Sequence, residues 1–330
     1  MMKDSSQFES LVLAKLKNLA SPLFKSEDYI EESFQAGALL YNPSLLIAYS
    51  ASEEASVLSF VLAHHEVNDG VEIHLVVDQE NSELYEQVLG FGLDITIWIA
   101  EGKELVKHPH ITPYQRIRVP EKARKLGAVL EKFDCRLLEE HGILRAEVHG
   151  LEVARVVQVE DGLFEINVGV GEYDQSAHNT LNGTAGIERN LEEVIATVRK
   201  FRSKQGAPHP LNRVLRSRWL MSEAVSNPDI LGLEQLDFLE SLLPSHGALR
   251  NEPCSAIGRK DESVTLVLAA TGMDLSLVPQ AGGQIRRHKP DSLIFLLPER
   301  DQHPAIFRQA QHLLIEPTFT MIEEPWPQLV

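Results

Sequence analysis

Two segments, one near each end of the chain, share the same alternation of apolar and polar residues. In each, an apolar run ends on a hydroxyl residue that is followed three positions later by an acid, and a second apolar run begins 27 or 28 residues after the first. The segments contain Leu45–Tyr49, Ser50 and Glu53, and Leu266–Ala270, Thr271 and Asp274. Short apolar runs of this kind predict buried, parallel-type strands. The hydroxyl-x-x-acid pattern predicts a helix start, because both side chains can accept hydrogen bonds from free backbone N–H groups.

The pattern divides the chain into four parts. A Rossmann-like α/β segment is followed by a helix, a three-stranded meander and a helix, then by a basic helical connector, and last by a second strand–helix–strand segment. The parts are 1–118, 119–205, 206–262 and 263–330. We therefore expect an α/β protein with parallel-type β-α-β units at both ends and a central α+β insert. The end units either share one sheet or form two similar lobes.

Between the clearest runs, the pattern predicts less regular elements. Residues 27–39 have a weak helical period, 101–119 predict no regular element because Pro109, Pro113 and Pro120 lie in or next to this stretch, and 121–134 predict a helix. A short helix is expected near 233–242. The three central strands are separated by two X-Gly turn signals, His149-Gly150 and Asp161-Gly162. These strands are expected at about 142–148, 151–159 and 163–170.

Composition indicates a protein of the aqueous phase. Apolar residues make up 43% of the chain and charged residues 24%, as in globular proteins. The apolar stretches are far shorter than the ~20 residues that span a bilayer, and the first residues lack the plan of a signal peptide. The two cysteines, Cys135 and Cys254, are too few for disulfide bonds to hold a chain of this size together, and they fit a reducing compartment. We expect a cytoplasmic protein with no membrane contact.

The charge is uneven. A net charge of −17 disfavours loose binding of nucleic acid, which depends on neutralising phosphates. Residues 199–218, however, hold seven cations and no acid. This basic segment either attracts an anionic partner or is a solvated face that pairs with the acidic remainder. The candidate anion-binding side chains in it are Arg213, Arg216 and Arg218.

Carboxylates gather in the central meander. If both turns are two-residue hairpins, Glu147 lies directly opposite Glu152, with Arg145 nearby on the same face. Like charges at opposed positions of a sheet are unfavourable, and either the arginine or a bound Mg²⁺ or Mn²⁺ would relieve them. The candidate catalytic carboxylates are Glu147, Glu152, Glu165, Glu172 and Asp174, and the candidate metal ligands are Glu147, Glu152 and Asp174.

The helix, three strands and helix over 121–204 resemble the core of the metal-dependent nuclease superfamily with a PD-(D/E)XK motif. The matching residues are Glu152 as the first acid and Glu165-x-Asn167 as the second half of the motif. The resemblance implies hydrolysis of nucleic acid with a divalent metal. The chain departs from the motif, because no proline precedes Glu152 and Asn167 replaces the activating lysine. The expected register pairs Glu165 with Gln158 and leaves Glu152 and Glu165 roughly 20 Å apart, too far for one metal to bridge.

Two functions remain open from the sequence. The hydroxyl–acid turns lie at the carboxyl ends of predicted parallel strands, where α/β sheets bind ligands, although such residues also serve simply as helix caps. We expect a non-catalytic binding or scaffold protein for a phosphate-bearing or nucleic acid partner, using residues 199–218 and these turns, with no cofactor evident. The alternative is a hydrolase that depends on Mg²⁺ or Mn²⁺ and has a degenerate nuclease-like core.

Overall fold

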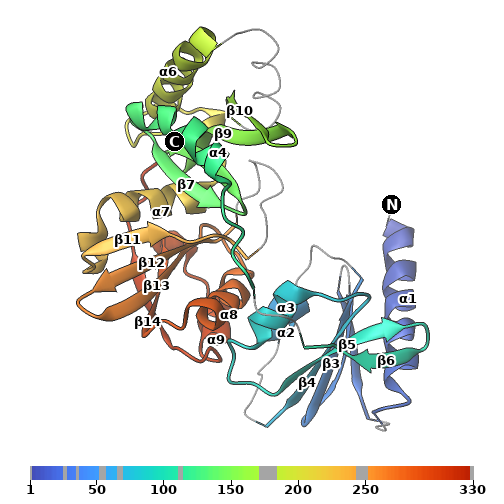
Figure 1. The fold of residues 1–330 in the computed structure, drawn as a ribbon. Coiled ribbons are helices and arrows are strands. Elements are labelled where there is room, and N and C mark those ends of the chain that lie inside the picture. The colour runs from blue at the N-terminus through green and yellow to red at the C-terminus, as the bar shows by residue number, and fades with distance from the viewer. Residues whose placement is uncertain are drawn as a thin grey trace. The chain divides into compact units, whose positions relative to one another are not determined.

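The computed structural model describes most of the chain. The described residues are 2–24, 28–34, 37–51, 57–64, 70–110, 114–170, 184–242 and 252–327. Within these ranges the chain forms three sheets with both parallel and antiparallel strands, which confirms a mixed α/β protein (Figure 1). No helix in the same ranges is long and apolar enough to cross a bilayer.

The N-terminal part forms a six-stranded sheet whose strands lie in chain order. The strands are β1 (Ile30–Phe34), β2 (Gly37–Asn42), β3 (Leu45–Ser50), β4 (Glu72–Val77), β5 (Ile95–Glu101) and β6 (Glu104–Lys107). Strands β3, β4 and β5 are parallel, and the other neighbours are antiparallel. The helices are α1 (Met2–Ala20), α2 (Val57–His64) between β3 and β4, and α3 (Ser82–Val88) between β4 and β5.

The apolar run of β3 becomes a buried central strand. Figure 1 shows α1 on one side of this sheet and α2 and α3 on the other. A strand covered on both faces needs apolar residues at every position, which explains the continuous run in the sequence. On α1, Val12 and Leu16 are one helical turn apart and pack in one cluster with Ile47 of β3.

Two expectations for this part are wrong. Residues 27–39, whose weak period suggested a helix, contain β1 and the start of β2, and residues 101–119, expected to be irregular, contain β6. Strands β1 and β6 are the two edges of the sheet. Edge strands have one partner and carry charged residues that discourage further pairing, so their sequences lack a clear strand pattern.

The central region forms a four-stranded antiparallel sheet in the order β10-β9-β8-β7. The strands are β7 (Arg136–Glu140), β8 (Ile143–Val148), β9 (Leu151–Glu160) and β10 (Leu163–Val168). The expected three-stranded meander therefore lacked β7, which begins soon after α4 (Glu121–Gly127) and the short 3₁₀ helix η1 (Ala128–Lys132). The turn before β8 is His141-Gly142, and both residues have positive φ, 49° and 77°, as a tight hairpin requires.

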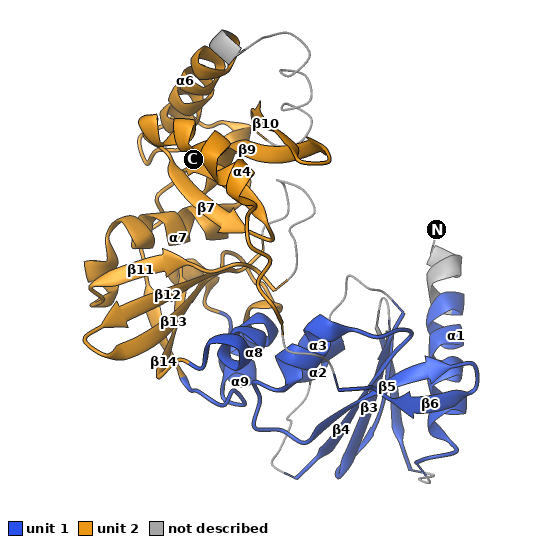
Figure 2. Ribbon diagram, in the orientation of Figure 1, with its two compact units in different colours: residues 1–113, 278–289, 303–316 blue, residues 114–277, 290–302, 317–330 orange. Residues whose placement is uncertain are grey.

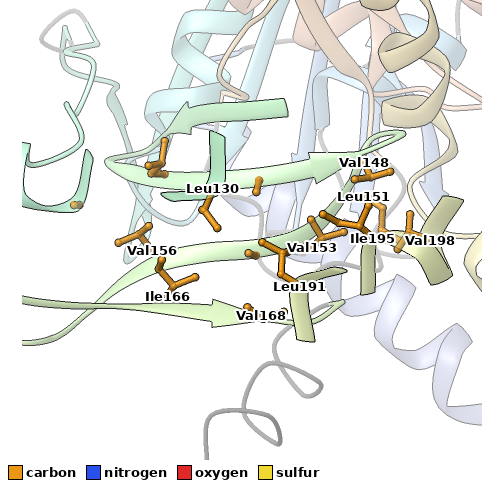
Figure 3. Close-up of a cluster of buried hydrophobic side chains, with 14 of the residues drawn as sticks. Leu130, Val148, Leu151, Val153, Val156, Ile166, Val168, Leu191, Ile195 and Val198 are labelled. Atoms are coloured by element: carbon orange, nitrogen blue, oxygen red, sulfur yellow. The ribbon is translucent and has the colours of Figure 1, made fainter. Parts of the chain in front are cut away.

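The core of the central region lies between this sheet and its helices (Figure 3). Helix α6 (Thr184–Phe201) contributes Leu191, Ile195 and Val198, which recur at helical spacing and are almost fully buried. They pack with Val153 and other inward-facing residues of the strands. The helix that follows the meander in the sequence is thus fixed to it by one apolar stripe.

The C-terminal part forms a five-stranded sheet in chain order. Its strands are β11 (Gln235–Phe238), β12 (Cys254–Lys260), β13 (Ser263–Ala269), β14 (Ser292–Leu297) and β15 (Pro317–Met321). Strands β13, β14 and β15 are parallel, and β11, β12 and β13 are antiparallel. The helices are η2 (Pro210–Asn212), α7 (Arg216–Ser226), η3 (Pro228–Leu231), α8 (Leu277–His288), η4 (Glu299–Asp301) and α9 (Pro304–Ala310).

Residues 206–262 contribute more to this sheet than the sequence suggested. The short helix expected near 233–242 is the strand β11, and β12 follows it in the same stretch. The turn between β12 and β13 contains Asp261 with φ of 52°. Their sheet partners, and not local periodicity, determine these strands.

The chain divides into two compact units (Figure 2). The first contains residues 1–113, 278–289 and 303–316, and the second contains 114–277, 290–302 and 317–330. Helices α8 and α9 thus belong to the first unit. There, Arg287 pairs with Glu86 at 2.6 Å, and Gln309 Nε2 donates to the Ser59 carbonyl at 3.1 Å.

Candidate functional site

The loops that follow the parallel strands of the C-terminal sheet gather polar residues at one edge. Strands β13, β14 and β15 run in the same direction, so their carboxyl ends lie at the same edge, which we call the carboxyl edge. Open α/β sheets bind ligands at this position. The residues that follow these strands include Thr271, Asp274, Arg300, Asp301, Glu324 and Trp326.

Helix α7 brings part of the basic segment to the carboxyl edge. Ser217 Oγ lies 3.4 Å from Thr271 Oγ1, which connects the first turn of α7 to the loop after β13. The Arg216 guanidinium lies over the Trp326 ring, 4.9 Å from its centroid, and Arg216 Nε donates to the Asn212 carbonyl at 2.8 Å. Two sets of residues that the sequence suggested separately therefore meet here.

Positive charge at this edge is concentrated on three arginines. Arg300 is paired, with its Nε 2.6 Å from Glu324 Oε1, and Arg213 is exposed. Burial lowers the pKa of Arg216, and the positive charges of Arg300 and Arg213 lower it further, whereas the carboxylates of Glu324 and Asp301 oppose this shift. A bound anion would relieve this repulsion between like charges.

The loop after β13 is held by hydrogen bonds to Asp274 within it and to Asp301 after β14. Gly272 has φ of 74°, and its N–H donates to Asp301 Oδ2 at 2.8 Å. Asp274 Oδ1 accepts hydrogen bonds from Ser276 N at 3.0 Å and from Ser276 Oγ at 2.7 Å. Helix α8 begins later, at Leu277, so Thr271 and Asp274 do not form the expected helix start. The short Asp side chain bonds to the residue two positions on, as in an Asx turn.

The carboxyl edge of the N-terminal sheet has balanced charge. Ser50 ends β3 and is buried, whereas Glu53 lies outside the described residues. Beside Ser50, the Tyr49 hydroxyl accepts a hydrogen bond from Lys15 Nζ at 2.6 Å and donates to Asp78 Oδ2 at 2.8 Å. Lys15 also pairs with Asp78 at 2.6 Å. The lysine charge is therefore neutralised in place by Asp78.

Arg202 holds the loop that leads into α7. It is fully buried and donates to the carbonyls of Leu211, Val214 and Leu215 at 3.2, 2.9 and 3.2 Å. Burial lowers the pKa of Arg202 to about 9, which still leaves it charged at neutral pH. Arg202 therefore positions Arg216 and is itself hidden from any partner.

Other cations of the basic segment also have partners within the protein. Arg199 pairs with Asp134, and Lys204 Nζ lies 2.5 Å from Glu323 Oε1. Arg218, which the sequence suggested as a contact for an anionic partner, instead forms ion pairs with Glu147 and Glu140. Of the three arginines proposed from the sequence, Arg213 and Arg216 lie at the carboxyl edge.

The opposed carboxylates of the central sheet are neutralised by arginines. Glu147 of β8 lies directly opposite Glu152 of β9 in the strand register, as the two-residue turn predicts. Arg218 Nε lies 2.8 and 2.9 Å from the two Glu147 oxygens, and Glu152 lies 2.5 Å from Arg155 and 3.5 Å from Arg145. Arginine therefore relieves the like-charge contact, which was the structural interpretation open from the sequence.

Glu140 joins the same network and was not foreseen, because it lies on the missed strand β7. Its carboxylate contacts Arg218 at 2.9 Å and Arg145 at 3.4 Å. Burial opposes ionisation of Glu140, but the charges of Arg218 and Arg145 hold its pKa below the ordinary value. A metal ion among these carboxylates would have to displace arginines that already compensate them.

The other candidate catalytic acids, and with them the candidate metal ligand Asp174, lie apart from this network or outside the described residues. Glu165 pairs with Val157, not with Gln158, because a bulge between Leu163 and Phe164 shifts the register. Glu172 and Asp174 fall outside the described residues. In the described ranges no group of three His, Cys, Asp or Glu side chains is arranged to hold a metal ion. A role for Mg²⁺ or Mn²⁺ stays a prediction from the sequence.

Arg300 and Glu324 are the residues of the carboxyl edge that the sequence reasoning missed. Both lie three residues after the end of a parallel strand, close to the position where Thr271 follows β13. The available signal was the strand end itself, since polar residues just after each apolar run share one edge. Comparison with models of known protein families, with curated proteins and with solved structures finds no match for this chain.

Proposed function

We propose that this protein is a cytoplasmic binding protein that holds an anionic, phosphate-bearing partner at the carboxyl edge of its C-terminal sheet. The proposal treats 45–77 and 263–297 as two β-α-β units and places the anion site at the second. The observation that carries it is the contact of Ser217 with Thr271, 3.4 Å between hydroxyl oxygens, which sets the start of α7 against the loop after β13.

The geometry of Arg216 supports a specific anion site. Its guanidinium is held by the Asn212 carbonyl and the Trp326 ring, so little side-chain freedom remains to be lost on binding. Guanidinium groups bind phosphate oxygens through paired N–H donors. Exposed Arg213 adds a second positive charge near Arg216.

The overall charge argues for a compact phosphate group over a long polyanion. The chain carries a net charge of −17, which repels an extended polyanion outside the site. Several cations of the basic segment are already engaged in internal ion pairs. The ligand is therefore expected to bind through the small number of arginines at this edge.

The test is calorimetric titration of the full chain with pyrophosphate. We expect saturable binding that weakens about tenfold in Arg213→Glu, which removes one charge-assisted contact and adds a repulsive charge. The matched control is Lys103→Glu, which makes the same change in net charge at an exposed position of the first unit. Binding should also weaken as salt is raised.

Equal pyrophosphate affinity in Arg213→Glu and Lys103→Glu would show that only net charge matters and would refute the proposed site at the carboxyl edge. The absence of saturable heat with the wild-type chain would remove the proposal itself. Arg216→Gln serves as a second variant, with its melting temperature measured beside the wild type because Arg216 also contacts Trp326.

A further inference from the structure

In the second unit, a histidine lies against a glutamate and a serine that are neighbours in the sequence, about a hundred positions further along the chain. His141 lies in the turn between β7 and β8, and Glu240 and Ser241 follow β11. His141 Nδ1 is 3.2 Å from Glu240 Oε1, and His141 Nε2 is 3.1 Å from Ser241 Oγ. One ring nitrogen thus faces a carboxylate and the other faces a hydroxyl.

The carboxylate is firmly held. Glu240 accepts hydrogen bonds from the Tyr114 hydroxyl and from the backbone N–H of His141. The side chains of His141 and Glu240 are only 7% and 8% exposed. A carboxylate at Nδ1 favours the tautomer that carries its proton there. The Nε2 lone pair is then directed at the Ser241 hydroxyl and can accept its proton.

The backbone of His141 is in the left-handed region, as its tight turn requires. Its φ is 49°, and that of Gly142 is 77°. A residue other than glycine in the left-handed region persists only where its surroundings determine it. Here the tight turn and the hydrogen bond from the His141 N–H to Glu240 both fix it.

Ser241 also lines a cavity. The cavity measures about 60 Å³, several times the about 10–15 Å³ that holds one water molecule, so a short acyl group fits. Arg145 and Arg155 line the same cavity, where both pair with Glu152, and guanidinium groups can stabilise an oxyanion. Glutamates line it as well, so its charges are nearly balanced, which favours a neutral ester.

We propose that Ser241, His141 and Glu240 form an acyl-transfer site that hydrolyses short-chain esters. Ser241 Oγ attacks the carbonyl carbon as its proton passes to His141 Nε2. The ester C–O bond breaks, His141 gives that proton to the leaving alcohol, and the acyl group stays on Ser241. Water then attacks the acyl carbon and gives a proton to His141, which returns it to Ser241 Oγ as the carboxylic acid leaves. Glu240 is a positioning residue that keeps its charge throughout.

This inference goes beyond the anion-binding function, which needs no catalysis, and it replaces the expectation that the protein is non-catalytic. The two proposals rest on different residues. Loss of pyrophosphate binding in Arg213→Glu would leave ester hydrolysis intact, and the reverse holds for Ser241→Ala. Failure of one proposal is therefore distinguishable from failure of the other.

The test uses the full chain with a fluorophosphonate probe and with p-nitrophenyl acetate. In the probe reaction the Oγ–P bond forms, the P–F bond breaks, fluoride leaves, and His141 takes the serine proton. We expect peptide mass spectrometry to locate the adduct on Ser241, and Ser241→Ala to abolish both adduct and hydrolysis. His141→Gln should slow labelling about 100-fold or more. Ser263→Ala, which alters an exposed serine of the same unit that does not line the cavity, should leave the labelling rate unchanged.

Three further results bear on the roles of the residues. The wild-type labelling rate should fall as the pH is lowered from about 8 to 5, because a protonated imidazole cannot accept the serine proton. In Glu240→Gln the midpoint of this pH profile should move down, because the carboxylate stabilises the imidazolium. An unmoved midpoint would remove the positioning role of Glu240.

Absence of a Ser241 adduct in the wild-type chain would overturn the proposal. So would an adduct that forms at the wild-type rate in a His141→Gln variant with an unchanged melting temperature. If that variant does not fold, the wild-type pH profile decides the question, and a rate that does not vary with pH would exclude His141 as the base.

Discussion

Replacement of Arg218 by Met tests whether the arginine network of the central sheet is structural. Arg218 donates to both oxygens of Glu147 and to Glu140, at 2.8, 2.9 and 2.9 Å. Glu140 retains Arg145 at 3.4 Å, but the hydrogen bonds described for Glu147 all come from Arg218. The substitution therefore strands a carboxylate that is 5% exposed.

Removing one partner of a buried ion pair typically costs about 3–5 kcal/mol. We expect a loss of this size in the free energy of unfolding at pH 8. The loss should be smaller at pH 5, because a stranded, buried carboxylate takes up a proton and so avoids part of the cost. The assay is urea denaturation followed by tryptophan fluorescence, since Trp219 and Trp326 lie buried in the second unit.

The matched control is Arg213→Met, at an exposed position of the same basic segment, which should change the free energy of unfolding by less than about 0.5 kcal/mol. The double variant Glu147→Gln with Arg218→Met should lose less stability than Arg218→Met alone, because no charge is then left unpaired. If Arg218→Met lies within about 1 kcal/mol of the wild type at both pH values, the network does not stabilise the fold and the reasoning is wrong.

Three further predictions concern other parts of the fold. Arg202→Met removes a donor from three carbonyl groups, of which Leu215 keeps the Trp219 N–H. It should cost about 3 kcal/mol in urea denaturation, and an unchanged free energy of unfolding would refute its structural role. Gly282→Ala places a Cβ 2.6 Å from the Gln87 carbonyl oxygen and should lower the free energy of unfolding by about 1–3 kcal/mol in the same assay. In the control Gly92→Ala, the atom nearest to the new Cβ is 3.9 Å away, so no clash is expected. The hydrogen bond from His149 holds the pKa of Glu223 below its ordinary value. The ionised Glu223 therefore stabilises the fold above its unfolded-state pKa of about 4.3, and this stabilisation is lost as pH falls through the folded-state pKa. Thermal melts from pH 6 to 3 should accordingly show a weaker acid dependence for Glu223→Gln than for the wild type.

The sequence pattern predicted central strands better than edge strands. The runs at 45–49 and 72–77 coincide with β3 and β4, which have neighbours on both sides. Four of the missed strands, β1, β6, β7 and β11, are edges of their sheets, whereas β2 and β12 were also missed although each has a neighbour on both sides. A central strand is covered on both faces and must be apolar, so burial leaves a signal in its composition. An edge strand is determined by one neighbour that can be far away in the chain.

The candidate sites show the same division. The opposition of Glu147 and Glu152 followed from the turn at His149-Gly150, because a two-residue hairpin fixes the register beside it. The arginine that neutralises Glu147 lies 71 residues further along the chain, and no spacing rule points to it. The register beyond Asp161-Gly162 failed for a local reason, since the bulge after Leu163 shifts every later pair by one residue.

The sequence by itself determined the α/β class, the central strands and the tight turns, because burial and hairpin geometry act on neighbouring residues. Only the tertiary structure decided which charges meet. It directed Arg218 to the carboxylates of the central sheet, set Ser217 against Thr271, and brought His141 to Ser241 across about a hundred positions of chain. Such encounters depend on how sheets and helices pack, and packing energy is shared among many residues, so no short pattern in the sequence records it.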